Sequence, residues 1–278
     1  MARAASSFHQ RCLVAYITKL SSVFGWAIIA TRRLGADARL YVCYTSSMNQ
    51  SQQKVAFFDI DGTVFRSSLL ISLVDELVDT NVFPSDAKED YRMARENWQN
   101  REGTYESYIA EVVGVFMKHL KGVHYGTIAD FGRAVVEEQS KRVYRYTRDL
   151  ITELKADDYY VVAISQSPKS ILDVFCENYG FDKVYGRMFE IGPTDRFTGK
   201  VTQEQEIANK ANIVKRVFTN ENLTSIGSVA VGDTEGDVPM LKLVERPICF
   251  NPNQALFEVA KQYAWPIVIE RKDVVYEL

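Results

Sequence analysis

The sequence has few of the features that mark zinc modules, disulfide-bonded scaffolds or membrane proteins. Its 278 residues include only four cysteines, and none of them lie at paired spacing, so neither a zinc knuckle nor a disulfide framework is indicated. This cysteine usage favours a reducing compartment, and we expect a cytoplasmic protein. The apolar stretch near the N-terminus is interrupted by Lys19, Ser21 and Ser22, well short of the ~20 apolar residues that a spanning helix requires. We therefore expect no stable membrane span.

Acidic residues are nearly absent from the first 53 residues, which carry six Lys or Arg and one Asp, a net charge of +5. The formal net charge of the whole chain is −3, so the remainder carries −8. A body of that sign has no general electrostatic attraction for nucleic acid, and we expect no nucleic-acid partner. An anionic substrate would have to be met by local positive groups or by a metal ion. The sequence indicates no particular oligomeric state.

Residues 1–53 form an N-terminal extension whose role stays open among three interpretations. Apolar residues at helical spacing in a basic segment with few acids fit a targeting or interfacial amphipathic helix, which would place the protein at a membrane surface or in a targeted compartment. The same spacing fits an extra docked helix. The third interpretation is an upstream extension absent from the working protein, which would then begin at Met48.

A short apolar run, 54–58, stops at two carboxylates, Asp59 and Asp61. Such a run predicts a buried parallel strand that delivers both acids to its carboxyl end, where open α/β sheets bind ligands. Gly62 lets the chain turn sharply and brings the backbone close to a bound group. This arrangement suits a hard cation and a phosphate, although Asp and Gly are also common in plain turns.

The next strand is predicted at 159–164, roughly a hundred residues later. Helical patterns fill the interval, at 67–79, 84–101, from Thr104 onward, and 125–155. A parallel crossover needs only about a dozen residues, so we expect residues 66–132 to form a helical cap. Residues 54–65 and 133–278 would then form the core domain.

Three later stretches place polar groups beside predicted strands and helices. Ser165 ends the second strand with the following amides free, a place where a hydroxyl and N–H groups hold phosphate oxygens, and Ser167 before Pro168 predicts a helix N-cap. After a predicted hairpin at 187–201, Lys210 opens another helix. A strand at 228–232 then ends at Asp233, with Asp237 four residues further on.

In this order, the four stretches resemble the four motifs of the haloacid dehalogenase (HAD) phosphatase superfamily, and the segment 260–266 resembles its phosphoserine-phosphatase-like branch (subfamily IB). The resemblance covers about residues 54–270. It implies an α/β fold, a doubly wound parallel Rossmann-like sheet with a helical cap inserted after the first strand. It also implies Mg²⁺ as cofactor, bound by Asp59, the main-chain carbonyl of Asp61, and Asp233, with Asp237 supporting the site from behind.

By the same resemblance, Asp59 would be the nucleophile and Asp61 the acid–base residue, while Ser165, Gln166 and Lys210 would bind the substrate phosphate. We expect a magnesium-dependent phosphomonoester hydrolase that acts through an aspartyl-phosphate on a small phosphorylated metabolite. The alternatives are a phosphotransferase with the same intermediate, a phosphoserine phosphatase, and a non-catalytic HAD-like binding module.

Phosphoserine is not the substrate that we expect. Members that hydrolyse it carry a glutamate after the first motif and an arginine in the cap, whereas Ser68 stands at the first position and the matching helix, 105–113, has no arginine. Arg66 or Arg101 could replace the arginine from another position. The better expectation is a phosphomonoester that lacks the zwitterionic head group, or one whose head group is read by the aromatic residues Phe65, Tyr105 and Tyr108.

Overall fold

The structure is a computed structural model that describes residues 52–202, 207 and 209–278. Within it, residues 52–278 form one compact unit. The interpretations offered for residues 1–51 lie outside the described residues. No helix in the part of the chain that the structure describes is both long and apolar enough to cross a bilayer.

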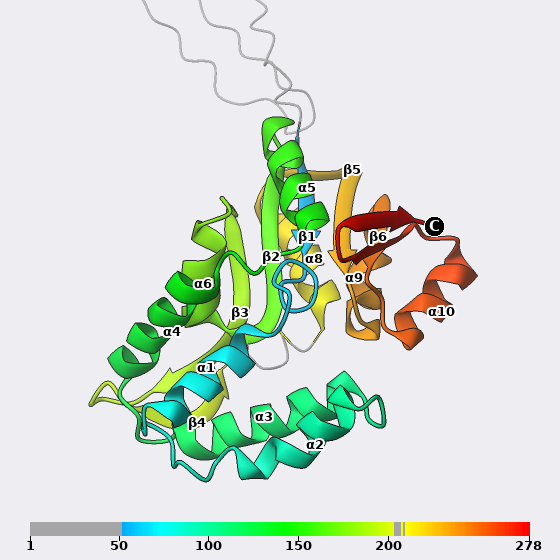
Figure 1. The fold of residues 1–278 in the computed structure, drawn as a ribbon. Coiled ribbons are helices and arrows are strands. Elements are labelled where there is room, and N and C mark those ends of the chain that lie inside the picture. The colour runs from blue at the N-terminus through cyan, green and yellow to red at the C-terminus, as the bar shows by residue number, and fades with distance from the viewer. Residues whose placement is uncertain (1–51, 203–206, 208) are drawn as a thin grey trace, which may run out of the picture. The chain divides into compact units, whose positions relative to one another are not determined.

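The described strands form one sheet in the order β4-β3-β2-β1-β5-β6-β7-β8 (Figure 1). Neighbours from β3 to β7 run parallel, while β4 and β8 pair antiparallel at the two edges. The predicted, mainly parallel α/β fold is confirmed. The strands are β1 Gln53–Phe58, β2 Tyr160–Pro168, β3 Lys183–Ile191, β4 Phe197–Thr202, β5 Leu223–Gly232, β6 Arg246–Phe250, β7 Ile267–Arg271 and β8 Val274–Glu277.

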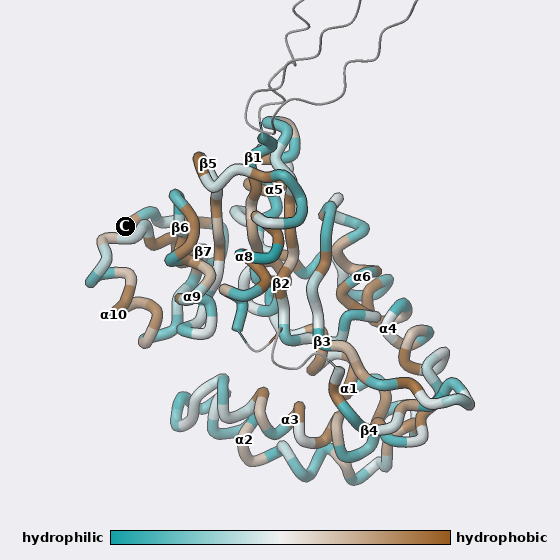
Figure 2. Tube along the Cα trace, turned by 180° about the vertical axis from the view of Figure 1, so that it is seen from behind, coloured by the Kyte–Doolittle hydropathy of each residue, from teal (hydrophilic) through white to brown (hydrophobic). Residues whose placement is uncertain are grey.

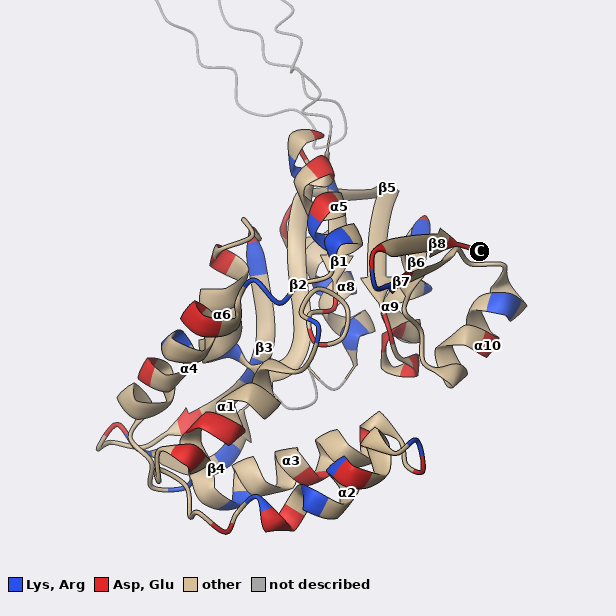
Figure 3. Ribbon diagram, viewed as in Figure 1, with Lys and Arg blue, Asp and Glu red and all other residues tan. Residues whose placement is uncertain are grey.

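Helices cover both faces of this sheet. They are α1 Leu69–Asp79, α2 Glu89–Gln99, α3 Tyr105–Leu120, α4 Tyr125–Gln139, α5 Arg145–Ala156, α6 Lys169–Glu177, α8 Lys210–Asn220, α9 Val238–Leu241 and α10 Gln254–Tyr263. In Figure 3, acidic and basic residues are interspersed along these helices, and the face shown has no continuous basic stripe among the described residues.

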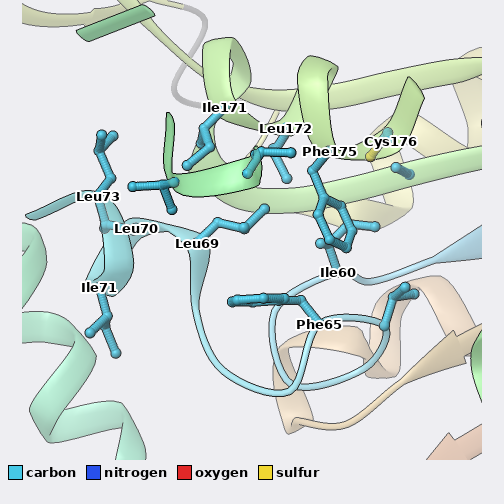
Figure 4. Close-up of a cluster of buried hydrophobic side chains, with 14 of the residues drawn as sticks. Ile60, Phe65, Leu69, Leu70, Ile71, Leu73, Ile171, Leu172, Phe175 and Cys176 are labelled. Atoms are coloured by element: carbon cyan, nitrogen blue, oxygen red, sulfur yellow. The ribbon is translucent and has the colours of Figure 1, made fainter. Parts of the chain in front are cut away.

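Strand β1 is buried on both faces because its apolar side chains alternate between two cores. Ala56 and Phe58 pack with residues of α1, α4, α5 and α6, while Val55 and Phe57 pack with residues of α8, α9 and α10. Figure 2 shows the hydrophobic colour concentrated along the central strands. Figure 4 shows how Phe65, just after β1, meets Phe175 of α6 in the first core. The strand that carries the two acids is thus fixed from both sides.

Helices α1 to α4 occupy the interval between β1 and β2. Helix α3 packs on α1, α2 and β4, and in Figure 1 α2 and α3 lie together below the sheet. Helix α4 continues without a break through residue 132, where the sequence places the end of the cap.

Two local expectations were wrong. The helix expected over 125–155 is two helices, because Val143 forms a bridge with Phe65 and the Tyr144 amide donates to the Val64 carbonyl, which holds the connection extended. Ser167 is not an N-cap. Strand β2 continues through Pro168, which pairs with Arg187 of β3, and α6 begins only at Lys169.

A carboxylate of β7 ties the loop after the first motif to the sheet. Glu270 is buried, and its Oε1 accepts hydrogen bonds from the Arg66 guanidinium (2.8 Å) and from the Arg145 amide (3.1 Å). Its Oε2 accepts from the Tyr146 amide (2.8 Å). Since both amides belong to the first turn of α5, the carboxylate also meets the positive end of that helix. This anchor was not expected from the sequence.

Candidate active site

The predicted site residues come from four separate stretches of chain and converge at the carboxyl ends of β1, β2 and β5. Asp59 follows β1 directly, and its amide donates to the Val231 carbonyl of β5 (2.9 Å). Lys210 is the first residue of α8, whose N-cap Asn209 accepts from the Ala211 amide (3.0 Å). The N-cap therefore fixes the position of the Lys210 backbone, from which its side chain extends into the site.

Lys210 links two carboxylates, Asp59 and Asp237, that lie far apart in the sequence. Its Nζ lies 2.5 Å from Asp59 Oδ1 and 2.5 Å from Asp237 Oδ1. All three side chains are at most 8% exposed. Burial by itself lowers the pKa of Lys210, but Asp237 and Asp59 outweigh it and raise that pKa above its usual value. The lysine is therefore a fixed positive charge against Asp59.

Both carboxylate oxygens of Asp237 accept hydrogen bonds from groups of the protein. Besides Lys210, it accepts from the amides of Asp233 (3.0 Å) and Thr234 (3.1 Å) through Oδ2. A Cβ on Gly232 would lie 2.4 Å from the Asp237 carboxyl carbon, so only glycine leaves room for this side chain. Asp237 thus shapes the loop that carries Asp233 and orients the lysine.

Asp233 and the turn after Asp61 approach each other closely. Thr63 Oγ1 donates to Asp233 Oδ1 (3.2 Å). Gly62 has φ +85°, and a Cβ there would lie 2.1 Å from Asp233 Oδ2. Both the backbone conformation and the contact exclude a side chain at this position. The first and fourth motifs therefore meet through a glycine that no other residue can replace without displacing Asp233.

Negative charge at this point is incompletely balanced. One carboxylate oxygen from each of Asp59, Asp233 and Asp237 can be chosen so that all lie within 4.8 Å of one another, with Lys210 as the neighbouring cation. Burial, opposed by Lys210 and reinforced by Asp237 and Asp61, raises the pKa of Asp59 to about 7. Burial and Asp59 raise the pKa of Asp233 well above its usual value. A site with excess carboxylate oxygens suits a small hard cation.

Asp61 is held apart from this cluster by two donors. Leu69, the first residue of α1, donates its amide to Asp61 Oδ1 (2.7 Å), and Ser165 donates its hydroxyl to Oδ2 (2.5 Å). Ser165 in turn accepts from the Ser167 amide (2.9 Å). The two acids of the first motif therefore have different surroundings, one facing Lys210 and the other facing α1 and β2.

Gln166 lines the site, but its side chain is engaged elsewhere. Its Nε2 donates to the Ile207 carbonyl (2.8 Å), and its Oε1 accepts from Arg187 (2.8 Å). A contact between Gln166 and a phosphate would therefore fall to its main-chain amide.

A cavity of about 220 Å³ opens over these residues. Asp59, Asp61, Lys210 and Asp233 lie at its base. Its remaining walls come from the loops beside them and from α1 and α3: Ser68, Leu70, Tyr105, Glu106, Ile109, Val113, Gln166, Ser167, Thr234 and Gly236. The residues of α3 were missed as a group, apart from Tyr105, because only the fold brings that helix over the first motif.

Two of the three aromatic residues expected to read the substrate do not line this cavity. Phe65 is fully buried and packs against Phe175, with ring centroids 5.6 Å apart. Tyr108 is buried against Trp98 (5.7 Å). Both side chains serve the apolar interior, and Tyr105 alone of the three reaches the cavity.

The fold and this set of carboxylates around one lysine define a class of hydrolases. The model of the haloacid dehalogenase-like hydrolase family matches residues 56–242, and the chain belongs to that family. The predicted resemblance is thereby confirmed.

Individual relatives are more distant. The chain is 24% identical to a phosphoserine phosphatase of Archaeoglobus fulgidus, over 82% of this chain and 60% of that protein. It is 27% identical to a histidinol-phosphatase of Neisseria meningitidis, over 38% and 50%. The chain thus spans only about half of the length of the curated relatives it matches. A solved structure of a phospho-aspartyl intermediate analogue of phosphoserine phosphatase shares the fold, with TM-score 0.54 and 21% identity over 80% of this chain and 95% of that one.

Proposed function

We propose that the chain is a magnesium-dependent phosphatase that cleaves a small phosphomonoester through a phosphorylated Asp59. The observation that carries this proposal is the state of Asp59 itself. It is a buried carboxylate that lines a cavity, 2.5 Å from a buried lysine and beside a second, half-buried acid, Asp233. A carboxylate that is shielded from water and faces a cation is suited to attack an anionic phosphate.

The residues fit a divalent cation because the carboxylates outnumber the one lysine among them and offer only oxygen donors. Asp59, Asp233 and the main-chain carbonyl of Asp61 would hold Mg²⁺, and Asp237, whose oxygens already have donors, would support the site without binding it. When bound, the ion would offset the repulsion between the carboxylate and the phosphate.

The chain's own groups supply the remaining steps. A bond forms between a carboxylate oxygen of Asp59 and phosphorus as the ester P–O bond breaks, and Asp61 gives its proton to the leaving oxygen. Water then attacks phosphorus, Asp61 takes up a proton from that water, and phosphate leaves while Asp59 is regenerated. Lys210 and the main-chain amides of Gln166 and Ser167, which line the cavity, would hold the phosphate oxygens together with Ser165, whose hydroxyl lies beside Asp61.

We further propose that residues 66–132 act as the cap that encloses the substrate, with residues 54–65 and 133–278 as the core. Support comes from α1 and α3, which line the outer part of the cavity. Phosphoserine is not the expected substrate, because Ser68 occupies the cap-hinge position and none of the cavity-lining residues in α3 is basic.

Phosphate release measured with no added acceptor tests this function. Asp59→Asn should abolish release and phosphoprotein formation, because an amide is not a nucleophile. Asp61→Asn should lower turnover by ~10²-fold or more and leave Mg²⁺ binding largely intact, because the proposed ligand is a main-chain carbonyl. Asp157→Asn, an exposed carboxylate outside the cavity, serves as the matched control. Near-wild-type activity in Asp59→Asn would refute the proposal, and turnover that requires an acceptor would favour a phosphotransferase.

A further inference from the structure

The outer half of the cavity differs in character from its base. Beyond the four groups Asp59, Asp61, Lys210 and Asp233, the side chains that α1 and α3 contribute are mainly apolar: Leu70, Ile109 and Val113. Tyr105 and Glu106, the first two residues of α3, add the polar groups. The alcohol part of a phosphomonoester bound at Asp59 would lie among these five side chains.

No positively charged residue in the described part of the chain lines this outer half. Among the described residues that line the cavity, Lys210 is the only Lys, Arg or His, and it is already paired with Asp59 and Asp237. The two arginines considered from the sequence lie elsewhere: Arg66 pairs with Glu270, and Arg101 is exposed outside the cavity lining. A carboxylate on the alcohol part would therefore be desolvated without a partner, which is costly.

Glu106 supplies negative charge instead. Its Oε1 accepts from the Asn253 side-chain amide (2.8 Å), which also donates to Glu235 (2.5 Å). No described residue donates a hydrogen bond to the other carboxylate oxygen, Oε2. One neutral amide thus bridges two acids at this side of the cavity, and Glu106 keeps acceptor capacity for a ligand.

Tyr105, beside Glu106, has a buried hydroxyl that lies close to the Ser68 side chain but makes no hydrogen bond of normal geometry among the described residues. A buried hydroxyl without a well-placed partner is unfavourable, so a ligand group that pairs with it is stabilised. An ammonium group donates up to three hydrogen bonds. It can use both the Glu106 carboxylate and the Tyr105 hydroxyl oxygen, while methylene groups contact Leu70, Ile109 and Val113.

Resting on the phosphatase function proposed above, we propose that the enzyme selects phosphate monoesters of amino alcohols, with an ammonium group on a short apolar chain and no carboxylate. Glu106 is the specificity-determining residue. A phosphoserine phosphatase needs a positive charge to bind the carboxylate of phosphoserine. Here that carboxylate would lie near the negative charge of Glu106 instead of near a cation.

The test compares matched esters in the presence of Mg²⁺. Phosphoethanolamine and phosphoserine differ by one carboxylate, while 4-aminobutyl phosphate and pentyl phosphate differ by an ammonium in place of a methyl group. The wild type should prefer phosphoethanolamine and 4-aminobutyl phosphate by tenfold or more in kcat/KM within each pair.

Glu106→Gln should bring the second ratio close to one, mainly by lowering kcat/KM for 4-aminobutyl phosphate, because glutamine keeps the acceptor for Asn253 but loses the charge. Glu111→Gln, the same change at an exposed position of the same helix, should leave the ratio unaltered. Tyr105→Phe should lower the ratio less than Glu106→Gln does.

Turnover of both pairs without these preferences in the wild type, or a preference that survives Glu106→Gln, overturns the inference alone. Release of phosphate from none of the esters, p-nitrophenyl phosphate included, overturns the proposed function together with it. The wild-type ratios stand as a test even if a variant fails to fold.

Discussion

The buried acids of the site should make the metal-free protein less stable as the pH rises. The pKa of Asp59 is raised from 3.8 to about 7, mainly by burial. Between about pH 4 and 7 the folded protein holds a proton on Asp59 that the unfolded chain has lost, so the free energy of unfolding falls across this window. One pKa unit corresponds to about 1.4 kcal/mol, which gives a loss of about 4 kcal/mol above pH 7.

Asp59→Asn removes the ionisable group while its amide oxygen can still accept from Lys210. Without metal, we expect the variant to exceed the wild type in stability by only about 1 kcal/mol near pH 4.5 and by about 4 kcal/mol at pH 8. For a chain of this size, each kcal/mol shifts the melting temperature by about 2–4 °C. The inactive variant should therefore melt roughly 10 °C higher than the wild type at pH 8.

Thermal unfolding in EDTA at pH 4.5 and pH 8 measures this effect, with Asp157→Asn as a variant that removes the same charge from an exposed position. Mg²⁺ at pH 8 should stabilise the wild type more than Asp59→Asn, because the cation relieves the repulsion that the variant lacks. An Asp59→Asn protein that is no more stable than the wild type at pH 8 in EDTA would refute the reasoning.

Three further expectations concern the frame of the site. Gly62→Ala should weaken Mg²⁺ binding at least tenfold in a titration, because its Cβ would displace Asp233 and a positive φ costs an alanine about 1–2 kcal/mol. Unchanged affinity would contradict the close approach. Glu270→Gln should lower the free energy of unfolding in denaturant by about 2 kcal/mol, whereas the exposed Glu277→Gln should not. A chain that begins at Met48 should keep its turnover, and lost activity on truncation would show that residues 1–47 contribute to the domain.

The sequence predicted the central strands and the residues at their ends because those signals are local. An apolar run that stops at Asp59, and another that stops at Asp233, indicate buried parallel strands whatever the rest of the chain does. The starts of the helices after Thr104 and at Lys210 are equally local, because in the structure the side chains of Thr104 and Asn209 accept hydrogen bonds from their first turns. The roles of these residues in chemistry stay predictions until the variants are assayed.

What the sequence did not predict depends on contacts between distant residues. The break between α4 and α5 has no glycine or proline to mark it and follows from the pairing of Val143 with Phe65. The end of β2 shifted past Ser167 because β3 offers Pro168 a partner. Glu106 looks like any acid in a first helical turn, and only the placement of α3 over the first motif brings it into the cavity.

The bond between Arg66 and Glu270 joins residues 204 positions apart, and this has a consequence for synthesis on the ribosome. While the chain is being made, the loop after the first motif and the first turn of α5 emerge long before their shared acceptor. A nascent chain that stops short of β7 holds every site residue from Asp59 to Asp237 but lacks the carboxylate that ties the loop after the first motif and the start of α5 to β7. The last part of the domain to be translated therefore completes the support of the first.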